Sequence, residues 1–257
     1  MRIATWNVNS VTARLPRLVD WLRDVSPDAV CLQETKVAAD AFPRDEVAAL
    51  GYDVAVRGDG RWNGVAIVSR LPLEDVTGSL VDEPGFPDPE ARAIAATVGG
   101  VRLWSVYVPN GREPGHDHYA YKLTWLDALR RTVEGELRDD LPLALLGDFN
   151  VAPTDADVWD PAAFVGSTHV TGPERAALAA LRDTGLADVL PRAMKYDTPF
   201  TYWDYRAGNF HKNLGMRIDL VYASAAFAGR VTDAYVDRDA RKGKGPSDHA
   251  PVVVDLA

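Results

Sequence analysis

The sequence of 257 residues predicts an α/β domain. Two observations support this fold class. Short apolar runs rich in Val and Ile recur along the chain, as expected of buried β-strands. Segments with the spacing of amphipathic helices lie between these runs, and strands that alternate with helices are typical of α/β architecture. No repeat, low-complexity tract or linker interrupts the pattern, so we expect residues 1–257 to form one domain.

Seven apolar runs have the length and composition of strands. Polar stretches that contain Gly or Pro bound them on both sides, which is typical of the turns between strands. The runs occupy residues 2–6, 29–32, 64–68, 101–108, 143–146, 218–222 and 252–256.

Three segments are expected to be helical. Residues 15–22 place Leu and Val at the i, i+3, i+4, i+7 spacing, and Pro16 would fit a first helical turn. Residues 123–137 carry a longer stripe of Leu and Val. Residues 173–181 follow Thr171, a typical residue at a helix N-terminus. Two polar stretches, 78–89 and 109–118, are expected to be long loops.

The charge balance leaves the partner open. The chain carries 28 Lys and Arg against 37 Asp and Glu, a net charge of −9, whereas a passive DNA-binding protein usually presents a basic face. An acidic total still permits a local basic surface, and a metal site requires clustered carboxylates. The basic run at 238–244 is typical of a solvated loop and does not decide the question.

Several features bear on location. No stretch approaches the run of about 20 apolar residues needed to span a membrane. The N-terminus lacks the apolar run of a secretory signal. The lone Cys31 lies in an apolar run and is expected to be a small core residue. We therefore expect a soluble, cytoplasmic protein without a membrane partner.

Polar residues stand at the ends of several predicted strands. If these strands lie side by side, their ends form one rim, and sites on α/β scaffolds commonly lie at strand ends. Taken singly, each such residue could merely cap a turn, which is their usual role; as a set they favour a functional site. The residues are Asn7, Glu34, Asp148, Asn150, Asp219, Asp248 and His249.

Four carboxylates on one rim would repel each other unless a cation neutralised them. Without a Cys cluster the ligands are hard oxygens, which favours Mg²⁺ or Mn²⁺ over zinc. Because Mg²⁺ usually takes one or two protein carboxylates, Glu34 and Asp248 are the expected ligands. Asp219 would then be free to hold His249 in one tautomer and orientation for acid–base chemistry. The remaining histidines are expected at the surface, namely His116, His118, His169 and His211.

Seven short motifs are distributed along the chain nearly from end to end. They are Trp6-Asn7-Val8-Asn9-Ser10, Leu32-Gln33-Glu34-Thr35-Lys36, Asn63-Gly64-Val65-Ala66, Tyr107-Val108-Pro109-Asn110-Gly111, Gly147-Asp148-Phe149-Asn150, Arg217-Ile218-Asp219 and Ser247-Asp248-His249. In this order and spacing they resemble the endonuclease/exonuclease/phosphatase superfamily. The stretches at 33–36, 107–110, 201–205 and 213–219 resemble bacterial exonuclease III and its mammalian abasic-endonuclease relatives in particular.

The resemblance implies a four-layer α/β sandwich like that of DNase I, with two packed mixed β-sheets flanked by helices. It also implies a Mg²⁺-dependent phosphodiesterase, with Mn²⁺ as a substitute, that acts on double-stranded DNA. The expected reactions are hydrolysis 5′ to abasic sites and removal of nucleotides or blocking groups from 3′ ends. We separately expect the protein to be a monomer.

Roles for individual residues follow from the same resemblance. The candidate metal set comprises Asn7, Glu34, Asp148, Asn150 and Asp248. Asp148 is expected to activate the attacking water. Asn150 and Tyr107 are expected to stabilise the phosphoryl group, and His249, paired with Asp219, to contact the scissile phosphate.

DNA contacts are expected at two places. An apolar pocket lined by Tyr202 or Trp203, together with Met216 and Ile218, would accept an extruded abasic sugar. Trp203 taken alone could equally be a core residue beside a strand. Elsewhere, the phosphate contacts and a groove wedge would come from Lys36, Arg92, Asn110 and Trp62.

Two other functions remain open. A phosphodiesterase or phosphatase of the same fold could act on lipid or inositol headgroups with the same catalytic residues. A DNA-binding module on this scaffold could lack catalysis altogether, although clustered carboxylates near phosphate would then serve no purpose.

Overall fold

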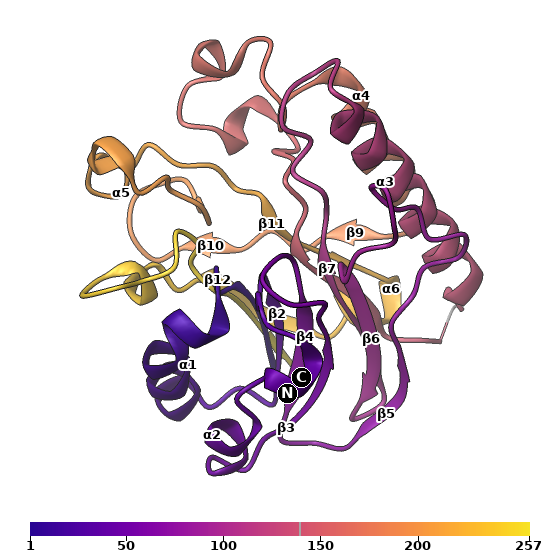
Figure 1. Cartoon of the computed structure of the whole chain (residues 1–257), viewed down its shortest axis with the longest axis vertical. Coiled ribbons are helices and arrows are strands. Elements are labelled where there is room, and N and C mark those ends of the chain that lie inside the picture. The colour runs from indigo at the N-terminus through magenta and orange to yellow at the C-terminus, as the bar shows by residue number, and fades with distance from the viewer. Residues whose placement is uncertain (139) are drawn as a thin grey trace.

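Two β-sheets pack face to face, with helices on their outer sides (Figure 1). The computed structural model describes residues 1–138 and 140–257. This arrangement confirms the predicted four-layer α/β sandwich. No helix in the described ranges has both the length and the apolar character needed to cross a membrane.

The first sheet contains the N-terminal and C-terminal strands of the chain. β1 pairs with β2 in parallel and with the C-terminal β13 antiparallel, so the sheet is mixed. Within the described residues its seven strands run in the order β10 (Arg192–Ala193), β12 (Val231–Val236), β13 (Val252–Leu256), β1 (Arg2–Asn7), β2 (Ala29–Gln33), β4 (Val65–Ser69) and β3 (Asp53–Arg57).

The second sheet is also mixed. β7 and β8 run parallel, whereas β8 and β11 run antiparallel. The six strands that the described part of the chain contributes are ordered β5 (Leu73–Thr77), β6 (Ala93–Val98), β7 (Val101–Tyr107), β8 (Leu143–Asp148), β11 (Asp219–Ala223) and β9 (Ala187–Asp188).

Helices cover the outer face of each sheet (Figure 1). α1 (Val11–Val25) and α2 (Arg44–Ala48) cover the first sheet, and α3 (Asp117–Glu136) and α4 (Gly172–Asp183) cover the second. Shorter helical segments lie in the connections: η1 (Ala39–Ala41), η2 (Asp155–Asp157), η3 (Pro161–Phe164), η4 (Arg206–Gly208), α5 (Asn209–Lys212), α6 (Ala225–Ala228) and η5 (Arg238–Arg241).

The alternation of side chains along the strands builds the layers. Ile3 on β1 and Leu103 on β7 both point into the core between the two sheets. Their neighbours Ala4 and Trp104 point the other way, into the cores beneath α1 and α3 respectively. Since successive side chains of a strand face opposite sides, apolar residues at consecutive positions fill both layers.

All seven predicted strands and all three predicted helices are confirmed, with ends that differ by a few residues. One detail of α1 is wrong. The side chain of Ser10 caps the helix by accepting a hydrogen bond from the amide of Ala13, so the helix starts at Val11. Pro16 therefore lies inside the helix and not in its first turn. At α4 the predicted cap is present, because Thr171 and Glu174 form a reciprocal capping box.

The sequence pattern missed four strands of at least five residues. β3 and β5 are edge strands with exposed polar residues, and β12 lies next to the short edge strand β10, so none of the three forms an apolar run. β6, with the sequence AIAATV, is buried but rich in Ala, which has low strand propensity.

Candidate active site

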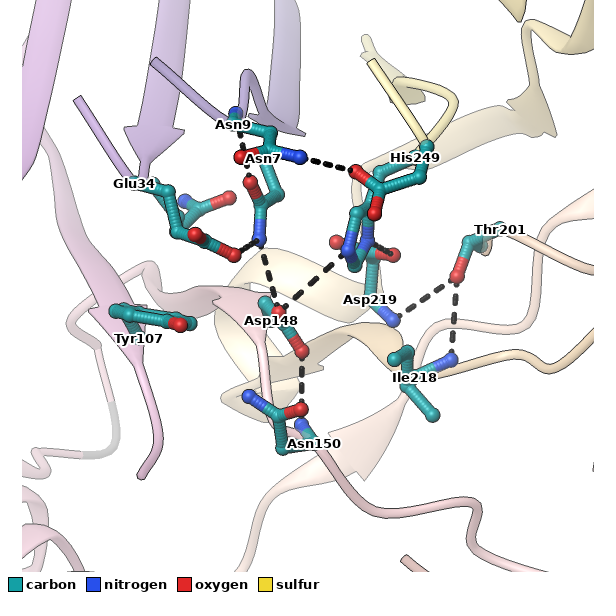
Figure 2. A network of polar contacts seen from close by, with 12 residues as sticks. Asn7, Asn9, Glu34, Tyr107, Asp148, Asn150, Thr201, Ile218, Asp219 and His249 are labelled. Atoms are coloured by element: carbon teal, nitrogen blue, oxygen red, sulfur yellow. Dashed lines mark hydrogen bonds and ion pairs between the residues drawn. The ribbon is translucent and has the colours of Figure 1, made fainter. Parts of the chain in front are cut away.

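Strand pairing brings the predicted rim together. Asn7 at the end of β1 lies opposite Gln33 at the end of the parallel β2. In the second sheet, Tyr107 at the end of β7 lies opposite Asp148 at the end of β8. Asp148 in turn lies opposite Asp219, the first residue of the antiparallel β11. These ends meet where the two sheets face each other (Figure 2).

Several residues just past the strand ends have left-handed backbone conformations. The φ angles are 46° at Asn9, 52° at Glu34, 54° at Lys36 and 50° at Asn150. For residues other than Gly, such conformations cost about 1–3 kcal/mol each and are concentrated at functional sites. The rim therefore carries backbone strain that the surrounding structure compensates.

Asn7 connects two of the carboxylates (Figure 2). Its side-chain Nδ2 donates to Glu34 Oε1 at 2.7 Å and to Asp148 Oδ2 at 2.9 Å. Its Oδ1 accepts a hydrogen bond from the backbone amide of Asn9 at 3.0 Å. A flipped amide would place its oxygen against both carboxylates, so this orientation is the favourable one. In this structure Asn7 thus faces the two carboxylates as a hydrogen-bond donor, and its role as a metal ligand stays a prediction.

Glu34, Asp148 and His249 form the central cluster, with one potential ligand atom from each lying within 4.8 Å of the others. Asp248, the other expected metal ligand, is not in this cluster but belongs to the same rim. Asn9 Nδ2 donates to Asp248 Oδ1 at 3.0 Å, and Lys36 Nζ lies 2.6 Å from both Asn9 Oδ1 and Glu34 Oε2. Asn9 and Lys36 therefore link Asp248 to Glu34.

His249 lies between two carboxylates. Its Nδ1 is 2.8 Å from Asp219 Oδ2, and its Nε2 is 3.8 Å from Asp148 Oδ2. Burial alone would lower the pKa of His249, but the charge and hydrogen bond of Asp219 and the charge of Asp148 raise it to about 10. At neutral pH His249 is therefore an imidazolium, which can donate a hydrogen bond but cannot ligate a metal.

Asp219, which binds Nδ1 of His249, is itself held in place. The hydroxyl oxygen of Thr201 accepts hydrogen bonds from the backbone amides of Ile218, at 3.1 Å, and Asp219, at 3.0 Å, where β11 begins (Figure 2). The ring of Tyr202 packs against His249 with 4.9 Å between the centroids. These contacts determine where the imidazolium lies.

Asp148 has the properties of a proton acceptor near neutral pH. Burial raises its pKa to about 7, and the charges of Asp219 and Glu34 act in the same direction, against the opposing effect of His249. Its Oδ1 accepts the backbone amide of Asn150 at 2.9 Å. A carboxyl with such a shifted pKa, buried beside charged partners, is typical of acid–base catalysis.

Glu34 and Tyr107 keep their ordinary charges. Burial alone would raise the pKa of Glu34, but the ammonium of Lys36 and the hydrogen bond from Asn7 lower it, so Glu34 stays an anion. Burial and the negative charge of Glu34 raise the pKa of Tyr107 well above its usual value. Tyr107 is therefore a neutral phenol that can donate a hydrogen bond.

Arg92 and Trp203, both expected to contact DNA, are buried. Arg92 is only 4% exposed. Its Nε lies 2.6 Å from Glu90 Oε2, and its guanidinium packs 4.8 Å from the ring centroid of Tyr107, so it supports the tyrosine. Trp203 is 1% exposed and meets Phe210 edge to face, which makes it the core residue that the sequence left open.

The expected pocket exists with a different lining. A cavity of about 170 Å³ is bounded by Tyr202 and Met216, as predicted, together with Trp159, Phe164 and Leu214. Ile218 is buried behind Met216 and does not line this cavity. Sequence reasoning missed Trp159 and Phe164 because they belong to an irregular segment without apolar periodicity.

The other expected DNA contacts are accessible to different degrees. Trp62 is 68% exposed. Asn110 lies at the rim, where its Nδ2 donates to Asn150 Oδ1 at 3.3 Å, while Asn150 Nδ2 donates to the carbonyl of Val108 at 2.9 Å. The expectation that His118 is a surface residue is wrong: it is buried, and its Nδ1 accepts the amide of Gly111 at 3.1 Å.

Comparisons with known proteins agree with this geometry. The Endonuclease/Exonuclease/phosphatase family matches residues 4–249. Exodeoxyribonuclease III of Haemophilus influenzae is 30% identical to the chain, over 98% of each sequence. The solved structure of the 3′ phosphatase NExo from Neisseria, bound to a product DNA hairpin, is 40% identical with a TM-score of 0.94, over 100% of this chain and 99% of that one. An AP endonuclease from Archaeoglobus fulgidus is 35% identical with a TM-score of 0.93, over the same shares.

The fold and the site thus define a class of phosphoester hydrolases. The chain belongs to the Endonuclease/Exonuclease/phosphatase family, and within it to the group of exonuclease III and AP endonucleases.

Proposed function

We propose that this protein is a Mg²⁺-dependent DNA-repair phosphodiesterase that hydrolyses the backbone 5′ to abasic sites and removes nucleotides or blocking groups from 3′ ends. The observation that supports this proposal most strongly is the contact set of Asp148. One buried carboxyl with a pKa raised to about 7 lies beside the imidazolium of His249 and shares the amide of Asn7 with Glu34.

The residues present fit a hard divalent cation. Glu34 is a half-buried anion, and Asp148 and Asp248 add carboxylate oxygens on the same rim. Because Mg²⁺ prefers oxygen ligands and keeps several waters, Glu34 with Asp248 would be sufficient to hold it, and Mn²⁺ would substitute. The bound cation would supply charge stabilisation at the phosphate.

The residues of the chain would do the rest of the chemistry. Asp148, ionised, accepts a proton from the water that attacks the phosphorus atom in line. His249 donates a hydrogen bond to a phosphate oxygen as its charge grows, with Asp219 fixing the ring, and Tyr107 and Asn150 add neutral donors. The water oxygen forms its bond to phosphorus opposite the P–O3′ bond, which breaks, and the leaving O3′ takes up a proton from solvent. The products therefore carry a 3′-hydroxyl and a 5′-phosphate.

The cavity beside His249 supports recognition of an abasic sugar. Its volume of about 170 Å³ is smaller than the ~300–1,000 Å³ typical of sites for drug-sized ligands. An abasic sugar leaves the helix at low cost because it has no base to unstack. Met216 and Tyr202 would contact this sugar and exclude a complete nucleotide. Since one chain supplies every candidate residue of the site, we propose that the protein acts as a monomer. We also propose that it acts in the cytoplasm.

The test compares three duplexes that carry one abasic analogue, one nick or one 3′-phosphate. Each is incubated with the protein and Mg²⁺, with and without EDTA, and the ends of the products are identified. EDTA-sensitive cleavage that leaves a 3′-hydroxyl is expected. A protein that binds these duplexes without cleaving any of them, or that releases phosphate only from lipid or inositol headgroups, would refute the proposal.

A further inference from the structure

An ion pair with no exposed surface lies beneath the rim. Lys122 on α3 and Glu174 on α4 are each 0% exposed in their side chains, and Lys122 Nζ contacts Glu174 Oε1. Burial of two charges is costly, and a buried pair is often no more stabilising than apolar residues of the same volume. Its presence therefore calls for an explanation other than stability of the fold.

The ammonium group binds the backbone on the underside of the active-site loops. Lys122 Nζ donates to the carbonyl oxygen of Asn150 at 2.7 Å and to that of Asn110 at 3.2 Å. A third contact joins it to Thr168 Oγ1 at 3.3 Å. Lys122 thus holds together two loops that are far apart in the sequence, one after β7 and one after β8.

The carboxylate of Glu174 completes the arrangement. Oε1 accepts hydrogen bonds from Thr168 Oγ1 at 2.7 Å and from the amide of His169 at 3.0 Å. Oε2 accepts from the amide and hydroxyl of Thr171, at 3.0 Å and 2.7 Å. Both carboxylate oxygens of Glu174 accept hydrogen bonds, so Glu174 fixes the Lys122 ammonium to the start of α4.

The two loops present amide side chains on their other side. Asn110 and Asn150 are hydrogen-bonded to each other through their side chains at 3.3 Å. The backbone amide of Asn150 donates to Asp148 while its carbonyl accepts from Lys122, so one residue connects the proposed base to the buried ammonium. The φ of 50° at Asn150, a conformation that favours glycine, turns the carbonyl toward the ammonium.

The loop after β7 packs directly on Lys122. Gly111 has a φ of 92°, and a Cβ at this position would lie 2.7 Å from Thr168 Oγ1 and 3.0 Å from Lys122 Cδ. A side chain therefore cannot be added at Gly111 without moving the loop away from Lys122. The close packing transmits the position of the ammonium to Asn110.

We propose that the Lys122–Glu174 pair is a positioning device that sets the amide side chains of Asn110 and Asn150, and through Asn150 the carboxylate of Asp148, for catalysis. This inference rests on the proposed function. Both residues act through others, because their side chains are fully buried and Lys122 contacts Asn110 and Asn150 only at their backbone carbonyls. A displacement of about 1 Å in a positioned group can slow a reaction by about a hundredfold, so loss of the ammonium would lower kcat more than it would raise KM.

The first test replaces the ammonium by an apolar chain of similar length, in Lys122→Met. The matched control is Arg102→Met. Arg102 is also a buried cation paired with a glutamate, Glu136, but it lies at the opposite end of β7 from Tyr107. Both variants are expected to lower Tm. Only Lys122→Met should lower kcat, by about tenfold or more, with KM within about twofold of the wild type. An unchanged kcat in Lys122→Met, or equal falls in both variants, would overturn the proposal.

Two further variants keep the test decisive if Lys122→Met is poorly folded. The double variant Lys122→Met/Glu174→Gln removes the unpaired buried charge and should regain Tm without regaining kcat. Recovery of kcat together with Tm would mean that the pair serves stability alone. Thr168→Val removes only the bridging hydroxyl and should lower kcat by about threefold. Its Tm should fall less than that of Lys122→Met, because the ion pair itself stays intact. A wild-type kcat in this variant and in the double variant would refute positioning.

A readout without substrate separates this inference from the proposed function. The side-chain amide signals of Asn110 and Asn150 in ¹H–¹⁵N NMR spectra of the free protein should shift in Lys122→Met and stay in place in Arg102→Met. Unshifted signals would contradict positioning even if DNA were cleaved, whereas shifted signals in a protein without nuclease activity would refute the proposed function alone.

Discussion

Asp148 and Asp219 lie directly opposite each other on β8 and β11, and one histidine contacts both. His249 binds Asp219 through Nδ1 and lies 3.8 Å from Asp148 through Nε2. The two carboxylates therefore have different environments. Asp219 stabilises the imidazolium, whereas Asp148 faces Glu34 and Asn7 and carries the raised pKa expected of a base.

Replacement of that base should separate chemistry from binding. Asp148→Asn removes the proton acceptor but leaves the cavity at Met216 intact. We expect single-turnover cleavage of an abasic duplex to slow by roughly 10²–10⁴-fold. The Kd for the same duplex, measured by fluorescence anisotropy, should change little. Turnover at the wild-type rate would remove Asp148 from the mechanism.

The cleavage rate should show a bell-shaped dependence on pH. Cleavage requires ionised Asp148, whose pKa is raised to about 7, and protonated His249, whose pKa is raised to about 10. The rate should rise as pH increases through the first value and fall as pH increases through the second. A bound cation favours the carboxylate anion, so a higher Mg²⁺ concentration should move the acidic limb to lower pH. If the pH midpoint of the acidic limb did not change with Mg²⁺ concentration, a cation near Asp148 would be contradicted.

The same two groups should affect stability in successive pH windows. A group whose pKa is raised by folding adds stability below its unfolded value and loses it as pH rises through its folded value. For Asp148 this window runs from 3.8 to about 7, and for His249 it runs from 6.5 to about 10. The free energy of unfolding of His249→Gln should therefore fall less than that of the wild type between pH 7 and 10, as urea titrations at each pH can measure. Parallel curves over this range would contradict the His249–Asp219 pairing.

Metal binding should depend on Glu34. In the wild type, Mg²⁺ added after EDTA treatment should raise Tm and restore cleavage, because a ligand that binds only the folded state stabilises it. In Glu34→Gln the Mg²⁺ concentration for half-maximal activity should increase by about tenfold or more. Glu83→Gln, at a glutamate whose carboxylate pairs with Arg57 away from the rim, serves as the control. The same Mg²⁺ dependence in all three proteins would exclude Glu34 as a ligand.

The cavity should determine preference for abasic sites. Met216→Ala enlarges the cavity and should reduce the preference for abasic over intact duplex by about tenfold, while removal of 3′ nucleotides slows less. Met194→Ala, at an exposed methionine outside the cavity lining, should leave both rates unchanged. Equal losses of both activities in Met216→Ala would show that the cavity has another role.

The sequence pattern located much of the rim because strand ends can be read from apolar runs. Glu34 and Asp148 follow such runs, and parallel neighbours bring their ends to one edge. Burial was the property that the pattern could not supply. Arg92 was expected to contact DNA, and Trp203 was left open between the pocket and the core. Both are buried, and Trp203 packs against Phe210.

The Lys122–Glu174 pair shows more clearly that burial cannot be predicted from the sequence pattern. Lys122 precedes the apolar stripe of α3 by one residue and has the sequence context of a solvent-facing lysine. Its burial depends on the packing of α4 against α3, which brings Glu174 and Thr168 from more than forty residues away. Contacts of this kind arise from tertiary structure and leave no local periodic signal.

The central claim is that Glu34, Asp148 and His249 form one metal-dependent site for cleaving a DNA backbone. The most direct test measures how fast the wild type and Glu34→Gln cleave a duplex with a single abasic analogue at increasing Mg²⁺ concentrations. We expect saturable, EDTA-sensitive incision on the 5′ side of the analogue, with a higher Mg²⁺ requirement in the variant. Absence of incision at any Mg²⁺ concentration in the wild type would contradict the account.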